Sequence, residues 1–540
     1  MNSPEQVGFD AVAAAEQMRL HLPDSHLMLP AQQSDDAPPP PEPGRMGLFP
    51  DELTDRAMAK LFARTFADRF RHVEGLGWFT WDEYRWKRVG GEKAAIWAAG
   101  DLAEQIPRTD PRGLFSDGQL QAHRRRTQST AGVKALLQQA QAAPGLSLDP
   151  DVLDGDVYAL CTPAGVVDLK TGELRKPDPL TDMHSRATTV APQMMATPRW
   201  DRFLTDTFGD DDKGRETISF LHLLLGYSVT GDVGAQVLPF LWGSGANGKS
   251  VLLDAMMQIL GEYANAAPPG FLMDQGKFAE HSTELTELHG RRIVVCSELK
   301  PNDKFNEARV KLLTGGDAIT ARRMRQDFFT FTPTHKLWLL GNHKPEVGTG
   351  GHAFWRRMRL IPFERKVPNH RKIDNLAAEL VRDEGPGILQ WLIDGARLYL
   401  TTRDPLDGPA SVRLATAAYE RTEDHIGRFL TERCTTGEAG RPDPRLRVEQ
   451  KLLYVTYTRW CADEGIQSAT SRAFASRIRQ ELGLASPAEM IKNNDRKMYP
   501  GLALLDDPPT RRPPATTRPT HGASGDAPSR PGAAGYVAVR

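Results

Sequence analysis

In the middle of the chain, continuous apolar runs are followed by stretches in which apolar residues recur at helical spacing. This pattern predicts strands followed by helices. An apolar run at 237–242 has the length of a buried strand, and apolar residues at 251–257 recur at helical spacing. Two later strands are expected at 291–298 and 336–341, and each ends beside a polar side chain. The pattern therefore predicts an α/β core at about 201–367.

The residues before this core, about 48–200, show a different pattern. Helical spacing at 55–70 is followed by aromatic residues spaced by two, from Trp78 to Trp86, which predicts a small sheet. A hairpin with a Thr-Gly turn is expected at 165–174. We therefore expect an N-terminal accessory domain of α+β type. Its tryptophans are expected to form core, and a platform on which bases stack is the alternative.

Four further segments complete the expected organisation. Residues 1–47 form a short N-terminal segment with a proline-rich linker, and residues 368–404 form a helical connection. Residues 405–505 are rich in helical spacing and end in a hairpin-like stretch. Residues 506–540 lack periodicity and are expected to be disordered.

Composition narrows the class of protein. The 540 residues exceed the size of a single core, and 40% hydrophobic with 25% charged residues are typical of a globular protein with several domains. The formal net charge of −1 argues neither for nor against a nucleic-acid partner. Four cysteines without a CxxC pair exclude a disulfide scaffold and disfavour a zinc site. No apolar run reaches the length that crosses a bilayer, so we expect a cytoplasmic protein without a membrane partner, in the host cytoplasm if phage-encoded.

The strongest chemical signal is the sequence GSGANGKS between the first strand and the first helix of the core. Glycines allow backbone N–H groups to close around phosphate oxygens, and the following helix directs its positive end at them. The lysine would reach the β- and γ-phosphates of ATP, and the serine would bind Mg²⁺. The predicted ATP-binding residues are Gly243, Ser244, Gly245, Ala246, Asn247, Gly248, Lys249 and Ser250.

Later positions fit the rest of an ATPase site. Glu298, at the end of the second strand, is the predicted general base and a second metal-contacting residue, and a surface glutamate is the alternative. Asn342, after the third strand, is predicted to orient the attacking water. Arg356 and Arg357 precede a further strand and are candidates for an arginine finger, with pairing to surface acids as the alternative.

The order of these motifs is specific. The chain contains, in sequence, GSGANGKS, IVVCSE, LLTGGDAITARRMRQDFFTF, LWLLGNHKP and FWRRMRLIPF. In this order they resemble the superfamily-3 helicases, and more narrowly the helicase half of phage and plasmid primases related to the poxvirus primase–helicase. The resemblance extends over about residues 50–505, more weakly outside the five motifs. One departure is Ser297, which stands before Glu298 where many members have a second acid.

The resemblance implies a fold, an assembly and a set of roles. The implied fold is a P-loop NTPase core of the AAA+-like superfamily-3 type, with an N-terminal α+β domain and a C-terminal winged helix. The implied assembly is a homo-hexameric ring that hydrolyses ATP between subunits and draws one DNA strand through its pore. The loop at 243–250 would be Walker A, Glu298 Walker B and Asn342 sensor 1, and Arg357 or Arg356 would be the finger.

Two segments are expected to contact DNA. Strands at 318–324 and 328–332 form a hairpin that faces the pore in the resembled family, and a solvated basic hairpin is the alternative. A capped helix at 468–479 follows a helix at 450–464, with a wing at 492–499, and a winged helix that packs only on protein is the alternative. The predicted DNA-contacting residues are Arg322, Arg323, Arg325, Lys311, Arg472, Arg477 and Arg479.

The sequence thus predicts an ATP-dependent ring helicase for phage or plasmid replication that acts on single-stranded and forked DNA. About 45 residues precede the resemblance, too few for a polymerase core, so we expect no primase site of its own and a separate primase or other replication proteins as partners. Two other classes stay open: a nucleotide-driven motor or switch for DNA packaging, partition or defence, and a non-enzymatic replication-initiator adaptor. The basic hairpin argues against the switch, and intact Lys249, Glu298 and Arg357 argue against the adaptor.

Overall fold

A computed structural model describes residues 49–505, except 276–282, 298, 323–327, 349–350, 403, 437–442, 444, 485, 487–488 and 494–495. The expected N-terminal segment at 1–47 and the tail at 506–540 lie outside the described residues. The chain divides into two compact units between Gly427 and Arg428. The first unit extends beyond the boundary expected at 405, because helix α12 (Ala410–Glu423) buries Val412 and Tyr419 in its cores. No helix in the described part of the chain has both the length and the apolar character needed to cross a membrane.

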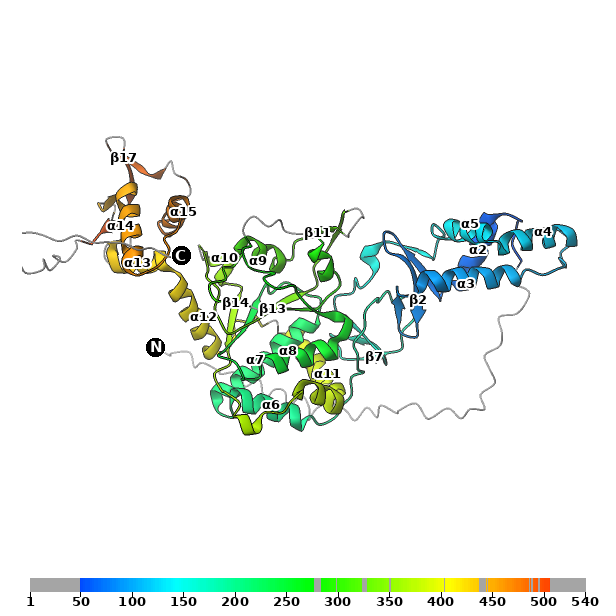
Figure 1. The fold of residues 1–540 in the computed structure, drawn as a ribbon, viewed down its shortest axis with the longest axis horizontal. Helices are drawn as coiled ribbons and strands as arrows, with labels where there is room; N and C mark the ends of the chain where they lie inside the picture. The colour runs from blue at the N-terminus through cyan, green and yellow to red at the C-terminus, as the bar shows by residue number, and fades with distance from the viewer. Residues whose placement is uncertain are drawn as a thin grey trace, which may run out of the picture. The chain divides into compact units, whose positions relative to one another are not determined.

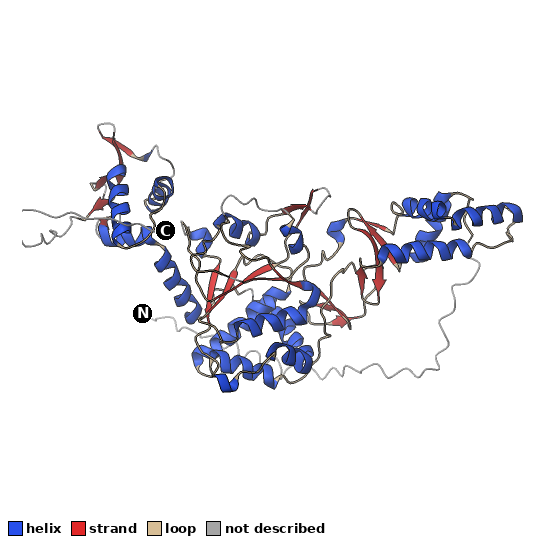
Figure 2. Ribbon diagram, in the orientation of Figure 1, coloured by secondary structure: helices blue, strands red, loops and turns tan. Residues whose placement is uncertain are grey.

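The centre of the first unit is a five-stranded parallel sheet (Figures 1 and 2). The strand order is β14 (Met358–Pro362), β8 (Leu238–Trp242), β13 (Lys336–Gly341), β10 (Ile293–Cys296) and β9 (Ala264–Ala266). All neighbouring strands run parallel. The strands predicted in the core are confirmed, and because they are parallel their carboxyl ends meet at one edge of the sheet.

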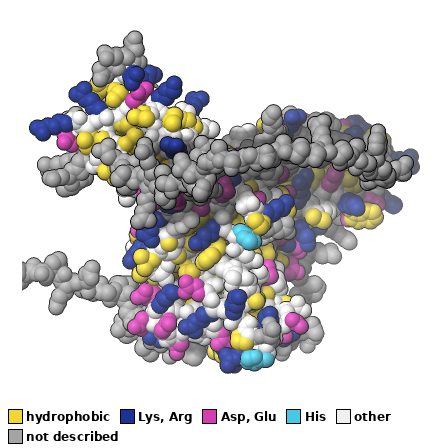
Figure 3. Space-filling view, turned by 60° about the vertical axis from the view of Figure 1, so that its left-hand side comes forward, with side chains coloured by type: hydrophobic (Ala, Val, Ile, Leu, Met, Phe, Trp, Pro, Cys, Tyr) yellow, Lys and Arg dark blue, Asp and Glu magenta, His cyan; other side chains and the backbone are white. Residues whose placement is uncertain are grey.

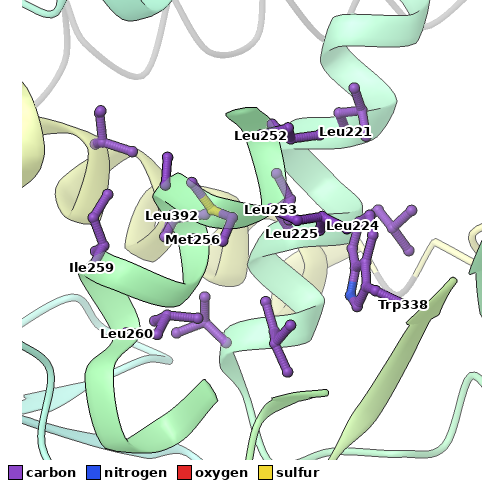
Figure 4. Close-up of a cluster of buried hydrophobic side chains, with 14 of the residues drawn as sticks. Leu221, Leu224, Leu225, Leu252, Leu253, Met256, Ile259, Leu260, Trp338 and Leu392 are labelled. Carbon is purple, nitrogen blue, oxygen red and sulfur yellow. The ribbon is translucent and has the colours of Figure 1, made fainter. Parts of the chain in front are cut away.

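Both faces of this sheet are buried, which explains the continuous apolar runs of its strands. On one face, Trp338 of β13 packs with α7 (Asp212–Val229), α8 (Lys249–Leu260) and α11 (Leu376–Thr402), as Figure 4 shows. On the other face, Leu337 and Leu339 pack with α9 (Glu307–Thr314), α10 (His352–Trp355) and α12. Each large apolar side chain buried in this way contributes roughly 1.5–3 kcal/mol, so these layers fix the loops at the edges of the sheet.

The N-terminal part of the first unit combines helices with a small sheet. The helices are α2 (Asp55–Phe66), α3 (Gly91–Glu104), α4 (Asp117–Gln128) and α5 (Thr130–Ala140), and the sheet order is β3 (Arg85–Lys87), β2 (Gly77–Asp82), β1 (Phe70–Val73) and β4 (Ser147–Leu148). Trp81 and Trp86 are cross-strand partners with ring centres 5.2 Å apart. Trp78 is 5% exposed and Trp86 is 0% exposed, so the expectation that these two tryptophans form core is confirmed, whereas Trp81 is only partly buried.

A second small sheet leads from this region to the central sheet. It contains β5 (Ala159–Thr162), β6 (Gly165–Asp168) and β7 (Leu174–Arg175). Val167 pairs with Leu174, and Gly172 has a φ of +80° in the turn, so the predicted hairpin is confirmed. The buried guanidinium of Arg292, at the amino end of β10, donates to the carbonyl oxygens of Asp156 and Val157 at 3.1 Å. These bonds join the β5–β7 region to the central sheet.

The second unit contains the helices and the hairpin expected near the C-terminus. Helices α14 (Gln450–Asp463) and α15 (Ser471–Glu481) accompany a sheet of order β16 (Arg447–Glu449), β18 (Arg496–Pro500) and β17 (Ile491–Asn493). The Thr470 hydroxyl caps α15 by accepting from the Ala473 N–H. Phe474 of α15 stacks on Tyr457 of α14 with ring centres 4.4 Å apart. Two short strands, β15 (Cys434–Thr435) and β19 (Ala503–Leu504), pair beside them.

Candidate functional site

The glycine-rich loop joins the carboxyl end of β8 to the start of α8. Gly245 and Gly248 have φ values of +96° and +87°, a region in which a side chain would be strained. At Gly243 a Cβ atom would lie 2.2 Å from the Asn247 side chain and 2.4 Å from the Phe363 carbonyl oxygen. The three glycines therefore permit a loop conformation that other residues would disturb.

The loop presents backbone N–H groups that can bind an anion. Within the described residues, no N–H from Ser244 to Ser250 donates to a backbone carbonyl outside the helices and strands. Gly248, the N-cap of α8, has no side chain to satisfy the first turn of that helix. Free N–H groups and the positive end of a helix dipole together favour a phosphate.

Lys249, the first residue of α8, is 5% exposed. Its ammonium group donates to the Gly243 carbonyl oxygen at 2.8 Å and to Asn247 Oδ1 at 2.9 Å. Both acceptors are neutral, and burial lowers the pKa of Lys249. A bound anion at the loop would supply the countercharge that these two partners lack.

A cavity of about 1240 Å³ opens at the loop. Helix α6 (Pro198–Phe208) lines it, and there Thr207 Oγ1 and a ring carbon of Phe203 lie 3.0 and 3.1 Å from the place of a Cβ at Gly248. The segment after β14 also lines it. Asn247 Nδ2 donates to the Phe363 carbonyl oxygen at 2.8 Å, and the Val367 N–H donates to the Ala246 carbonyl oxygen at 2.9 Å. Neither segment carries a motif in the sequence that points to a role at the glycine loop.

The segment after β14 brings four cations to the cavity: Arg365, Lys366, Arg371 and Lys372. Arg365 also forms an ion pair with Asp211 at 3.6 Å. Arginine and lysine side chains suit the charge of a polyphosphate. The one signal in the sequence is the density of basic residues at 365–372, and nothing local shows that this stretch returns to the glycine loop.

Two of the predicted ATPase residues lie with the loop. Ser250 and Asn342 both line the cavity. Asn342 directly follows β13, which is hydrogen-bonded to β8, with Gly341 opposite Trp242. The end of β13 and the start of the glycine loop are therefore neighbours. Glu298 lies outside the described residues, although its strand β10 is confirmed next to β13.

Arg356 and Arg357 are not part of the same site. They precede β14, and Met358 at the amino end of β14 pairs with Leu238 at the amino end of β8. The glycine loop follows the opposite, carboxyl end of β8. Arg357 is buried and donates to Thr314 Oγ1 at 3.0 Å, to Gln236 Oε1 at 3.1 Å and to the Ala353 carbonyl oxygen. Burial, and then the neighbouring Arg356, lower the pKa of Arg357. Arg356 is exposed and donates to Gln236 Oε1 at 2.5 Å.

The predicted hairpin consists of β11 (Ile319–Arg322) and β12 (Phe328–Phe331), so its strands are confirmed. Arg322 is opposite Phe328, and its guanidinium lies 5.1 Å from the ring centre. Phe328 is 62% exposed, which is unusual for a phenylalanine and was missed in the sequence analysis. Arg323 and Arg325 lie outside the described residues. Lys311, on α9, pairs with Glu307 at 3.6 Å.

The predicted arginines of the second unit lie on α15 and differ in exposure. Arg472 is exposed, Arg477 forms an ion pair with Glu481, and Arg479 is half-buried. On the face shown in Figure 3, Lys and Arg side chains predominate over Asp and Glu on this unit. Arg472 is therefore the most accessible of the three predicted contacts.

Two stretches of the chain match known protein families, and parts of it are similar to named viral proteins. Residues 59–209 match the family model described as D5 N terminal like, and residues 241–357 match the one described as a family of unknown function, DUF5906. Over 167 residues the chain is 31% identical to “Putative helicase L207/L206” of Acanthamoeba polyphaga mimivirus, which covers 31% of this chain and 17% of that protein. Over 217 residues it is 24% identical to “Putative primase C962R” of African swine fever virus, which covers 37% of this chain and 22% of that protein. The chain is related to the viral primase–helicase family.

The similarity to these viral proteins extends over only part of each chain. “Putative helicase 184R” of Invertebrate iridescent virus 6 is 32% identical over 150 residues, which cover 27% of this chain and 15% of that protein. The chain thus matches less than a quarter of the length of each of these relatives. Among solved structures, the C-terminal region of NrS-1 has a TM-score of 0.37 at 12% identity and covers 59% of this chain and 79% of that one. In this chain, the match to the family described as D5 N terminal like ends at residue 209. This position directly follows helix α6, which lines the cavity.

Proposed function

We propose that this chain is an ATP-dependent DNA helicase with a P-loop NTPase core of the AAA+-like superfamily-3 type. The observation that carries the proposal is the glycine loop with its buried Lys249, placed at the carboxyl edge of a parallel sheet beside Asn342. This edge is where ligands of open α/β sheets bind. The relatives named as helicases and primases support replication as the process.

The residues present fit ATP and Mg²⁺. The N–H groups of 244–250 and the charge of Lys249 suit the β- and γ-phosphates, and the Ser250 hydroxyl and Glu298 would hold the metal. Bound Mg²⁺ would supply neutralisation of phosphate charge. We assign Glu298 as the general base that accepts the proton of the attacking water, and Asn342 as the group that orients this water.

The position of the arginines supports a ring. Arg356 lies at the amino edge of the sheet, roughly 16 Å from the loop by the length of a five-residue strand, so it cannot reach the nucleotide of its own subunit. Arg356 is exposed, whereas Arg357 is held in its own chain, and we therefore assign Arg356 as the finger. A homo-hexamer with ATP between subunits would bring it to a neighbouring loop.

The hairpin supports single-stranded DNA as the partner. A cation beside an exposed aromatic ring, as in Arg322 and Phe328, suits a phosphate next to a stacked base. A nucleotide switch would not need such a hairpin, which favours the helicase over the other motors. We further propose that the second unit is a winged helix that contacts forked DNA through Arg472.

The test is ATP hydrolysis with and without single-stranded DNA, together with unwinding of a forked duplex. Wild-type turnover should rise with DNA, and Lys249→Ala should abolish nucleotide binding and unwinding because the charge at the phosphates is lost. Lys213→Ala is the matched control, since Lys213 is an exposed lysine that pairs with Glu364 at 2.9 Å. Hydrolysis that Lys249→Ala leaves intact would refute the proposed site.

A further inference from the structure

A second cavity of about 460 Å³ continues from the first. The two share Val251, Ile373 and Leu376 in their linings. The shared residues begin directly after Ser250 of the glycine loop. The space at the loop therefore extends along α8, away from the phosphate end.

One wall of this second cavity is the outer face of α8. Val251, Asp254 and Gln258 follow at spacings of three and four, so they share a face of the helix, while Leu252, Leu253 and Met256 point into the core (Figure 4). Asp254 lies one turn, roughly 6 Å, beyond Ser250 along the helix axis. The face thus changes from phosphate-binding groups to side chains that can bind other parts of a ligand.

The other wall is the segment 373–378, at the start of α11. Ile373 is 51% exposed where the two cavities meet, although it is a large apolar residue. Val251 and Leu376 beside it are only partly buried. Asn375 adds an amide in the left-handed backbone region, with a φ of +56°. The site therefore combines an uncovered apolar surface with hydrogen-bonding side chains, as a flat heteroaromatic ring requires.

Asp254 is the charged residue in the lining of this second cavity, and its side chain is exposed. Within the described residues no hydrogen bond or ion pair is made by its carboxylate, and burial raises its pKa. An exposed carboxylate at the wall of a cavity is an acceptor that a ligand N–H group can reach. Gln258 and Asn375 can each both donate and accept.

We infer that this second cavity holds the base of the nucleotide, between Val251 of α8 and Ile373, and that Asp254 accepts a hydrogen bond from an exocyclic amino group of a purine. The inference rests on the proposed nucleotide site. It concerns the base of the nucleotide, whose identity the phosphate-binding loop cannot distinguish. Phosphate binding is common to all nucleoside triphosphates, so discrimination between bases must come from groups outside the loop. Asp254 is therefore the specificity-determining residue.

The test compares ATP with purine riboside 5′-triphosphate, which lacks the 6-amino group, by isothermal titration of the full chain with Mg²⁺. The wild-type chain should bind ATP at least about fivefold more tightly, the low end of the discrimination that base-specific hydrogen bonds provide. Asp254→Ala should bring the ratio close to one, because the acceptor is gone, with little change in affinity for the purine analogue. Asp254→Asn keeps an acceptor oxygen and should retain part of the preference. Glu216→Ala, an exposed acid on α7, is the matched control.

The outcomes separate the two proposals. If neither triphosphate binds the wild-type chain, the proposed function fails. If both bind equally, or if Asp254→Ala keeps the preference for ATP, base recognition by Asp254 is wrong while the helicase proposal stands. If circular dichroism shows that Asp254→Ala does not fold, the ratio of the two affinities is compared between Asp254→Asn and the wild-type chain instead.

Discussion

At the scale of single residues, Arg356 and Arg357 show how neighbours in sequence take different places. One is exposed, and the other is buried with hydrogen bonds to Thr314 and Gln236. Thr314 ends α9, which precedes the hairpin, and Gln236 precedes β8, so Arg357 connects three parts of the first unit. A side chain held in this way stabilises its own subunit.

Replacing Arg357 should therefore change stability. We expect Arg357→Ala to lower the free energy of unfolding by about 1–3 kcal/mol, because buried hydrogen-bonding groups lose their partner. Arg356→Ala should change it by less than about 0.5 kcal/mol, as is usual for an exposed residue. Urea denaturation followed by tryptophan fluorescence measures both. A stable but catalytically inactive Arg357→Ala variant would make Arg357 the finger instead.

At the scale of elements, the β11–β12 hairpin is a surface whose two kinds of contact can be separated. Under our proposal, Phe328 would offer its exposed ring to a base, and Arg322 would offer its charge to a phosphate. Stacking does not release counterions, whereas phosphate neutralisation does. The salt dependence of binding therefore distinguishes the two residues.

We expect Phe328→Ala to weaken single-strand binding by roughly 1–3 kcal/mol without changing the salt slope. Arg322→Ala should reduce the magnitude of the slope of log K against log salt by about 0.7, the value for one phosphate contact on a single strand. Fluorescence anisotropy of a labelled oligonucleotide from low to moderate salt measures both effects. Thr330→Ala, an exposed position on the same strand, is the control. A slope for Arg322→Ala equal to that of the wild-type chain would place the phosphate contact elsewhere, and an unchanged affinity of Phe328→Ala would do the same for the stacking contact.

At the scale of the whole molecule, one subunit does not contain a complete site under our proposal. The glycine loop lies at the carboxyl edge of the sheet and Arg356 lies at the amino edge. The parallel strands keep these edges apart, so completion requires a second copy of the chain. This geometry makes the assembly testable by mixing variants.

Lys249→Ala and Arg356→Ala subunits should each be inactive alone, since an arginine finger is worth roughly 10³–10⁵ in turnover. Mixed in equal amounts, they should regain ATPase activity, because about a quarter of the interfaces in random rings join an intact loop to an intact arginine. Native mass spectrometry must show subunit exchange, and a mixture kept below the exchange temperature is the control. If activity is not recovered despite exchange, Arg356 does not act between subunits. A chain that stays monomeric in the presence of ATP and DNA would contradict the proposed ring.

The sequence by itself determined the features that depend on neighbours along the chain. The strand–loop–helix around GSGANGKS, the hairpins at 165–174 and 319–331, and the core role of Trp86 all follow from local spacing. In each case the residues that decide the structure lie within about a dozen positions of one another, where periodicity and turn chemistry act.

Only the tertiary structure decided which distant segments meet. The strand order β14-β8-β13-β10-β9, the basic segment 365–372 at the loop and the cavity beside Asp254 arise from contacts such as Asn247 to Phe363, 116 residues apart. The burial of Arg357 has the same origin, because Thr314 lies 43 residues away. Such contacts form only when the helices cover both faces of the sheet, and their hydrophobic packing leaves no trace in the spacing of the residues that it brings together.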